Sequence, residues 1–168
     1  MNTRVKSGGA GRGARSLARI AAVQALYQMD IAGTDLNDVI TEFQTLRFTA
    51  TDEAAGAGDT DAQFFADILR GVVRHQRDID PAIDEQLAAG WRLVRVDSIL
   101  RAILRGGVFE LMERRDVPAR VAINEYIEVA HAFFDDDEPK VVNGVLDRLA
   151  RRLRPTEFEA RAADAAEG

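Results

Sequence analysis

Residues 117–149 read VPARVAINEYIEVAHAFFDDDEPKVVNGVLDRL and contain two apolar stretches on either side of an acidic turn. In both stretches apolar residues recur at intervals of three and four, which is the spacing of one face of an α-helix. Pro118 and Pro139 stand where each stretch begins, and proline suits the first turn of a helix but breaks a helix that precedes it. The segment therefore predicts two amphipathic helices joined by a short charged turn.

The rest of the chain keeps this helical spacing, and no segment alternates convincingly with the period of two expected of a strand. Gly33 has the position of a helix stop, and Thr60 with Gln63 has the spacing of a capping box. Asp80 and Pro81 have the form of an N-cap and first position of a short helix. An all-α fold of about seven helices in two small packed bundles is expected. Before residue 117 the helices are predicted at 14–32, at 36–46, from 60 onward, at 80–90 and at 96–114, with a loop at 48–59.

The predicted central helix, 96–114, has an uninterrupted apolar face formed by Leu100, Ile103, Leu104, Gly107, Val108 and Leu111. Gly106 and Gly107 each weaken such a helix by about 1 kcal/mol relative to alanine, so a compensating interaction is expected. The simplest is the close approach of a neighbouring backbone, which glycine permits because it has no side chain.

The composition is that of a small protein whose folding requires no metal ion, disulfide or cofactor. The chain has 168 residues, 46% of them hydrophobic, and no cysteine, so it fits one domain without Cys zinc sites or disulfides. No apolar run approaches the length of a membrane span, and residues 1–15 lack the apolar stretch of a secretory signal. We expect a cytoplasmic protein that does not associate with membranes. The expected organisation is a flexible basic arm at 1–13, a single helical domain at 14–154 and a disordered tail at 155–168.

Positive charge is concentrated at the amino terminus although the chain as a whole carries a net charge of −6. No acidic residue precedes Asp30, whereas the same segment holds Arg4, Lys6, Arg12, Arg15 and Arg19. The last two arginines are four positions apart and so share a helical face, near a helix start where the dipole favours acids instead. Such an arrangement fits a phosphate-bearing partner such as RNA, and it also fits a solvated basic extension.

Motifs of catalysis and metal binding are missing from the sequence. It contains no Gly-rich phosphate loop, no HExxH and no GxSxG, and its two histidines are far apart. The acidic turn DDDE at 135–138 lacks the alternating ligands and central glycine of an EF-hand loop, and it suits the positive end of the following helix. We therefore expect a protein that is not an enzyme and has no metal site.

Four segments resemble the NusB family of transcription antitermination proteins, in the family's order and across roughly residues 12–154. The segments are RGARSLARIAAVQALYQMD, DAQFFADILRGV, DSILRAILRGGVFELMERRDVPARVAINEYIEVAHAFF and PKVVNGVLDRL. The resemblance implies a fold of two packed three-helix bundles. It also implies binding to the single-stranded boxA element of nascent ribosomal RNA operon transcripts, together with ribosomal protein NusE. Contact with the elongating RNA polymerase complex would be indirect.

The resemblance also implies which residues bind RNA. The family's arginine-rich motif falls on Arg12, Arg15 and Arg19, and its functional aspartate before the last helix falls on Asp137. Lys140 and Asn143 lie on the opening turns of that helix. The basic helix start and the acidic corner are expected to form one surface for unpaired ribonucleotides, with cations on phosphates and Asp137 accepting from a base.

Two other functions remain open from the sequence. A similar helical module occurs at the amino end of RNA cytosine methyltransferases, but only 13 residues follow Pro155, too few for a catalytic domain. Alternatively, the chain is a homodimeric protein-interaction module that no longer binds RNA. An apolar helix face looks the same whether a subunit or another helix covers it, so the sequence leaves a homodimer possible.

Overall fold

The computed structural model describes residues 13–48, 60–87 and 92–159, and this part of the chain is helical with no strand, as expected. A π-helical turn continues α2, and a 3-10 turn precedes α4. The elements are α1 (Ala14–Ala32), α2 (Leu36–Glu42), η1 (Phe43–Arg47), α3 (Ala62–Gln86), η3 (Leu93–Arg95), α4 (Ser98–Glu113), α5 (Ala119–Phe133) and α6 (Glu138–Leu153).

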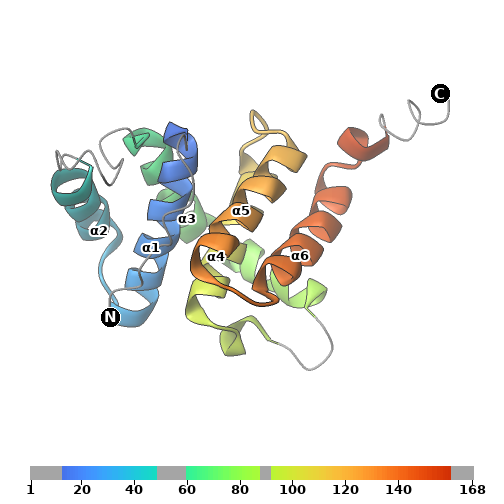
Figure 1. Ribbon diagram of the computed structural model, residues 1–168, viewed down its shortest axis with the longest axis horizontal. Helices are drawn as coiled ribbons and strands as arrows, with labels where there is room; N and C mark the ends of the chain where they lie inside the picture. The colour runs from blue at the N-terminus through green and yellow to red at the C-terminus, as the bar shows by residue number, and fades with distance from the viewer. Residues whose placement is uncertain (1–12, 49–59, 88–91, 160–168) are drawn as a thin grey trace.

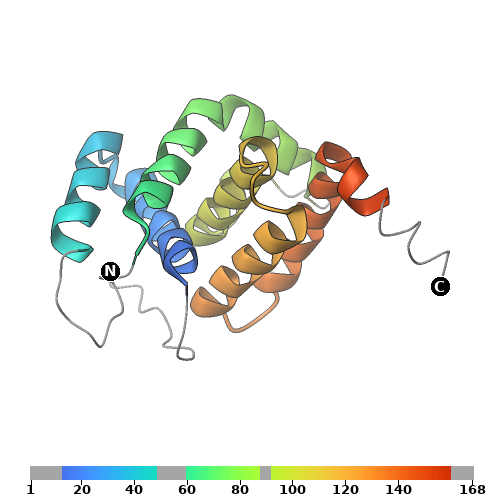
Figure 2. The same cartoon turned by 90° about the horizontal axis from the view of Figure 1, so that it is seen from above.

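The helices form the two three-helix bundles that were predicted. Figure 1 shows α1, α2 and the first turns of α3 in one half of the molecule and α4, α5 and α6 in the other. Figure 2 shows that the later turns of α3 cross to the second half, where the Gln86 carbonyl accepts a hydrogen bond from Arg148 of α6. Helix α4 contacts α1 and α3 as well as α5 and α6, so it belongs to both halves of the core. Its predicted apolar face from Leu100 to Leu111 is buried. One continuous core therefore fixes the bundles against each other.

In the first bundle the structure confirms the predicted helix stop at Gly33 but departs from the predicted second helix. Gly33 ends α1 in the left-handed conformation, with φ 66°, as expected of a helix stop. The stripe predicted for 36–46 is buried only as far as Phe43, and Leu46 is largely exposed. In the π-helix each hydrogen bond spans five residues, so the later side chains are rotated relative to an α-helix. Phe48, predicted to begin a loop, packs edge-on against Phe65 with ring centroids 4.9 Å apart, while 49–59 lie outside the described residues.

The start of α3 corrects a prediction. The N-cap is Asp61, whose carboxylate accepts a hydrogen bond from the backbone N–H of Phe64 at 2.9 Å. The predicted capping box of Thr60 and Gln63 is therefore wrong, and the Gln63 side chain donates a hydrogen bond to Asp67 instead. An aspartate one position later competes well because its ionised oxygen is the stronger acceptor at the positive end of a helix.

Asp80 and Pro81 do not begin a new helix, because α3 runs without interruption from Ala62 to Gln86. Asp80 is held instead by Arg105 of α4, through two hydrogen bonds of 2.9 Å. Ile79 and Ile83, on either side of the proline, are fully buried. Tertiary contacts on both sides of Pro81 thus offset the backbone hydrogen bond that proline cannot make.

The two glycines of α4 are buried, but side chains and not a backbone lie against them. A Cβ added at Gly106 would stand 2.9 Å from the Tyr126 ring, and one at Gly107 would stand 2.8 Å from Leu146 Cδ1. The prediction that a neighbouring backbone approaches these glycines was therefore wrong, but close packing is the reason for the two glycines, as predicted. The two glycines lower the helix propensity of α4, but the absence of their side chains leaves space for two large, fully buried residues of α5 and α6.

Residues 155–159, the first part of the expected tail, form a further helical turn. The Glu157 carboxylate accepts a hydrogen bond from the backbone N–H of Ala119 at 3.0 Å, which ties this turn to the first turn of α5. Residues 160–168 lie outside the described part, as do 1–12 and 88–91.

Gly71 tests how tightly α3 packs on α4. A Cβ at this position would lie 2.0 Å from the Phe109 ring, so Gly71→Ala should lower the free energy of unfolding by about 1–3 kcal/mol through overpacking. The roughly 1 kcal/mol that alanine adds to a helix offsets part of this loss, so the net loss is expected to be up to about 2 kcal/mol. Gly144→Ala in α6 is the matched control, because its Cβ would meet only the end of the Arg148 side chain at 3.3 Å. Urea unfolding should show the control equal to or more stable than wild type; a stabilised Gly71→Ala would contradict this packing.

Candidate nucleic-acid interface

Arg15 is the exposed cation at the start of α1. Its side chain is 47% exposed and lies 3.5 Å from Asp116 and 3.9 Å from Asp61. The N-cap is Gly13, which offers no side-chain hydrogen bond, and no acid occupies the first turn of the helix. The positive end of the α1 dipole and the Arg15 charge therefore both attract an anion to the start of α1. Arg12 lies outside the described residues.

Arg19 shares a helical face with Arg15, as predicted, but its environment differs from the expected one. Both guanidinium groups lie over the Phe64 ring, at 4.6 Å for Arg15 and 4.9 Å for Arg19. Arg19 is only 3% exposed and donates two hydrogen bonds, of 2.9 and 2.8 Å, to the fully buried carboxylate of Glu110. Its donors face the protein interior, so the expected direct contact with RNA does not fit this structure.

The surroundings of Arg19 form a buried polar network. Burial alone would lower the pKa of Arg19, but the hydrogen bond and charge of Glu110 outweigh it and the pKa is raised. A second carboxylate, Glu125 of α5, lies 3.5 Å from Arg19 and accepts a hydrogen bond of 2.8 Å from Ser16. Burial and the charge of Glu110 raise the pKa of Tyr126, which stays neutral at physiological pH. The network therefore joins the first turns of α1 to both α4 and α5.

The acidic corner before α6 is exposed, as a binding surface requires. Asp137 and Lys140 are 87% and 86% exposed and form an ion pair of 3.6 Å. Asn143, one turn further along α6, is also exposed. Asp137 precedes the helix without a side-chain capping hydrogen bond. The carboxylate, the ammonium group and the amide are thus accessible to a ligand.

Arg15 and Asp137 lie toward opposite ends of α5. Arg15 contacts Asp116, just before α5, whereas Asp137 comes just after α5 ends. The 15 residues of α5 make a rod of about 22 Å at 1.5 Å per residue. In Figure 1 the first turn of α1 lies at the top of the molecule and the loop between α5 and α6 lies at the bottom. Arg19 lies beside Glu125 in the middle of α5, so a surface that it shares with Asp137 stays a prediction.

A second arginine, not singled out from the sequence, lies beside Arg15. Arg114, at the end of α4, donates two hydrogen bonds to Asp116, at 2.9 and 3.0 Å, and a third of 3.1 Å to Asp67. Its guanidinium also lies over Phe64, 5.0 Å from the ring centre. The charged run ERRD at 113–116 is the signal in the sequence, but nothing there indicates which of these charges meets a residue about a hundred positions away.

Arg154 fixes the turn that carries Arg114 and Asp116. It is 2% exposed and donates to the backbone carbonyls of Glu110, Leu111, Arg114 and Val117. These include carbonyls at the end of α4, where no further helical turn supplies N–H donors. A cation at the negative end of the helix dipole is favourable there. The α4–α5 turn is therefore built rigidly from the end of α6.

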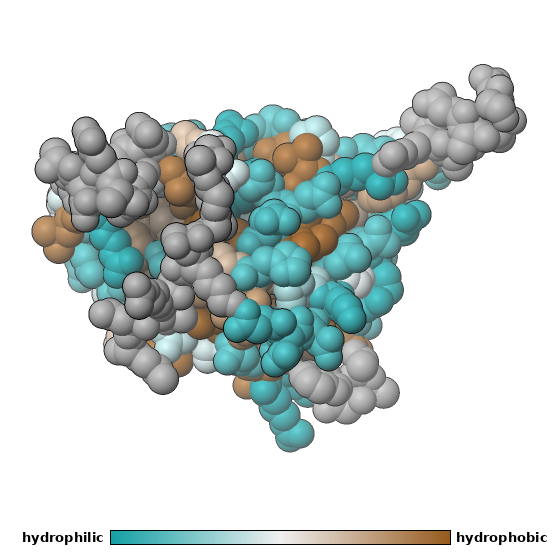
Figure 3. Space-filling view, viewed as in Figure 1, coloured by the Kyte–Doolittle hydropathy of each residue, from teal (hydrophilic) through white to brown (hydrophobic). Residues whose placement is uncertain are grey.

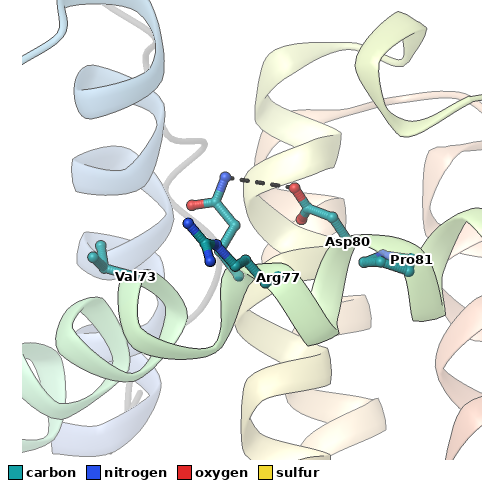
Figure 4. Close-up of a pocket in the computed structure, with 5 residues that line it drawn as sticks. Val73, Arg77, Asp80 and Pro81 are labelled. Atoms are coloured by element: carbon teal, nitrogen blue, oxygen red, sulfur yellow. Dashed lines mark hydrogen bonds between the residues drawn. The ribbon is translucent and has the colours of Figure 1, made fainter.

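Other surfaces of the described part offer weaker candidates. Figure 4 shows an open hollow along one side of α3, lined by Val73, Gln76, Arg77, Asp80 and Pro81. Its Asp80 carboxylate is already occupied by Arg105. Within the described residues no group of three or more His, Cys, Asp or Glu side chains is placed to hold a metal ion. In the same residues no helix is long and apolar enough to cross a membrane.

The face that carries α5 and α6 is mainly polar. Figure 3 shows hydrophilic residues over most of these two helices, with a small hydrophobic area between them. The geometry thus defines an all-helical protein of two packed three-helix bundles, with accessible charged side chains at both ends of α5.

The NusB family model matches residues 16–151, and the chain belongs to the NusB family. Among its relatives is the transcription antitermination protein NusB of Maricaulis maris, 55% identical over 144 residues, which are 86% of this chain and 90% of the relative. The protein of the same name from Rhodopseudomonas palustris strain TIE-1 is 52% identical over 144 residues, covering 86% of this chain and 83% of the relative. The family is one of transcription antitermination proteins.

Solved structures agree with this placement. The structure of T. maritima NusB has a TM-score of 0.72 and 29% identity, and the match covers 89% of this chain and 99% of that chain. The solution structure of NusB from Aquifex aeolicus has a TM-score of 0.64 and 27% identity, covering 84% of this chain and 90% of that chain. The two-bundle fold of this chain is therefore that of the family.

Removing one partner of the Arg19–Glu110 pair should be costly. Arg19→Met leaves a buried carboxylate without its partner, so we expect the free energy of unfolding to fall by about 3–5 kcal/mol. The double variant Arg19→Met/Glu110→Leu removes both charges and should lose much less than the sum of the two single changes. Arg15→Met, on the same helical face but exposed, should change stability by about 1 kcal/mol or less. Strictly additive effects in urea unfolding, or equal effects of Arg19→Met and Arg15→Met, would contradict the assignment.

Proposed function

We propose that this protein is a non-enzymatic transcription antitermination factor that binds boxA RNA of nascent ribosomal RNA operon transcripts. It acts in the cytoplasm together with ribosomal protein NusE, and through this assembly it is linked indirectly to the elongating RNA polymerase. The observation that carries the proposal is the exposed Arg15 at the uncapped, acid-free start of α1 in a chain of the NusB family. An arginine placed there favours phosphate, because its guanidinium and the helix dipole attract the same anion.

The RNA strand would run along α5. The cations toward its two ends are Arg15, near the α4–α5 turn, and Lys140 on α6, and α5 itself, with 15 residues, is about 22 Å long. A stacked strand advances about 3.4 Å per nucleotide, so about six nucleotides bridge the two ends. This is within the site size of single-strand-binding modules, about 4–16 nucleotides.

The residues divide into two roles along this path. Arg12, Arg15 and Lys140 would neutralise phosphates, which gives affinity without sequence preference. Asp137 and Asn143 are exposed hydrogen-bonding groups that would read the edges of splayed bases, with Asp137 accepting from an amino group and Asn143 donating or accepting. Arg19 would act indirectly by holding the first turns of α1 in place through Glu110.

No covalent bond is made or broken in this function. A contact with about three phosphates is weak by itself, so its effect depends on a second contact to the same complex. With NusE bound to the protein and to the polymerase assembly, the RNA contact becomes intramolecular and is strengthened by effective concentration. The factor thus retains the boxA segment near the elongating enzyme.

Arg15 provides the test of this proposal. Three neutralised phosphates give a slope of log affinity against log salt of about −2, and Arg15→Ala should reduce its magnitude by about 0.7 and weaken binding of a boxA oligonucleotide. The control is Arg152→Ala, which removes a comparably exposed, ion-paired arginine on α6 and should leave the slope unchanged. Fluorescence anisotropy between 50 and 200 mM salt, with and without NusE, measures both. If wild type does not prefer boxA to a scrambled strand even with NusE, or if Arg15→Ala binds like wild type, the proposal is wrong.

A further inference from the structure

Asp116 lies between two arginines in the way that an oxygen-rich anion would. Arg114 donates to both of its oxygens, Nε to Oδ1 at 2.9 Å and Nη2 to Oδ2 at 3.0 Å. Arg15 approaches the same Oδ2 from α1, with its Nη1 at 3.5 Å. The carboxylate side chain is 52% exposed. Two guanidinium groups from different helices thus converge on one accessible anionic group, the geometry in which arginines bind phosphate.

The two arginines are positioned before any ligand arrives. Both guanidinium groups lie over the buried Phe64 ring, at 4.6 Å for Arg15 and 5.0 Å for Arg114. The turn between α4 and α5 is held by Arg154, whose guanidinium is buried among its carbonyls. Little conformational entropy would therefore be lost when an anion binds, which favours even a single phosphate contact.

The start of α1 adds to the attraction for an anion. Its N-cap, Gly13, has no side chain to satisfy the first N–H groups, and the first turn contains no acid. Asp61, the remaining carboxylate near Arg15, is 3.9 Å away and also caps α3 by accepting from Phe64 N–H. Asp67 is likewise bound to Arg114, at 3.1 Å. Of these three carboxylates, Asp116 alone contacts both arginines in the described residues.

We propose that Arg15, Arg114 and the first turn of α1 form a binding site for one phosphodiester group of RNA, and that Asp116 is the internal competitor that occupies it in this structure. The inference rests on the proposed function for the identity of the polyanion, and adds to it both Arg114 as a contact and Asp116 as a group that restrains affinity. On binding, a backbone phosphate takes the place of the Asp116 carboxylate, which turns toward solvent.

The exchange is energetically easy in both directions. Exposed ion pairs contribute only about 0–1 kcal/mol, so little is lost when Asp116 releases its arginines. A phosphodiester carries the same charge as a carboxylate and accepts the same bidentate hydrogen bonds from arginine. The hydrogen bond from Arg114 lowers the pKa of Asp116, so the competitor is ionised throughout the neutral pH range. The competition therefore persists under all ordinary binding conditions.

The experiment compares Asp116→Asn with Asp147→Asn. The two changes remove the same charge, and Asp147 is also an arginine-paired surface aspartate, 3.0 Å from Arg151, but on α6. A boxA oligonucleotide and a scrambled strand of equal length serve as probes. Asp116→Asn should raise the affinity for both strands by about fivefold, because the phosphate no longer has to displace a carboxylate, and should leave the salt slope nearly unchanged, because the same single phosphate is bound. Asp147→Asn should change neither quantity.

A second variant tests the arginine itself. Arg114→Gln should lower the affinity for both strands and cancel the effect of Asp116→Asn in the double variant, because the competitor then has little left to compete for. Circular dichroism melting confirms that each variant is folded. The Asp116 side chain is half exposed, and its partners on other residues are the arginines at the surface, so Asp116→Asn is expected to fold normally and is decisive if Arg114→Gln does not.

The outcomes separate this inference from the proposed function. If Asp116→Asn behaves like Asp147→Asn on both strands, the phosphate site is wrong, while preferential binding of boxA by wild type still supports the proposed function. If both strands gain affinity equally but boxA is never preferred, the site is supported and boxA recognition fails. If neither strand binds to wild type or to Asp116→Asn, both are overturned.

Discussion

The position of the first turns of α1, on which the proposed RNA contacts depend, is set by one buried ion pair between Arg19 of α1 and Glu110 of α4. Two hydrogen bonds of 2.9 and 2.8 Å join charges that are almost fully removed from solvent, and either charge alone would be very unfavourable there. Because α4 also contacts α3, α5 and α6, the pair fixes the first helix relative to both bundles. A second contact from Ser16 to Glu125 extends the connection to α5. The exposed start of α1 is therefore held rigidly although no side chain caps it.

This rigidity gives the surface charges a defined geometry. Arg15 and Arg114 are held at one end of α5 by the Phe64 ring and by the turn that Arg154 supports. Asp137 and Lys140 stand at the other end, about one α5 length away. A ligand that engages both ends must be extended, and the proposed single strand of RNA would place a phosphate at Arg15 and a base at Asp137. In the proposed phosphate site the Asp116 carboxylate already contacts both arginines, so RNA would have to compete with it.

The sequence predicted the helices and the core well, because both depend on spacing within one element. The apolar face of α4, the stop at Gly33 and the break at Pro118 required no knowledge of distant residues. The prediction failed where a partner far along the chain decides the outcome. Arg15 and Arg19 share a helical face as expected, yet Glu110, 91 positions later, withdraws only the second from solvent. The continuation of α3 through Pro81 likewise depends on tertiary contacts that periodicity cannot show, and the role of Arg114 follows from its position beside α1.

The central claim, that Arg19 is an internal support and Arg15 the exposed contact, can be tested directly by NMR of the arginine Nε–H groups. The Arg19 signal should exchange slowly with water, because its proton is hydrogen-bonded inside the protein, and should remain in place when boxA RNA is added. The Arg15 signal should exchange quickly and move during the same titration. An Arg19 proton that exchanges as fast as that of Arg15, and shifts with it on addition of RNA, would contradict the account.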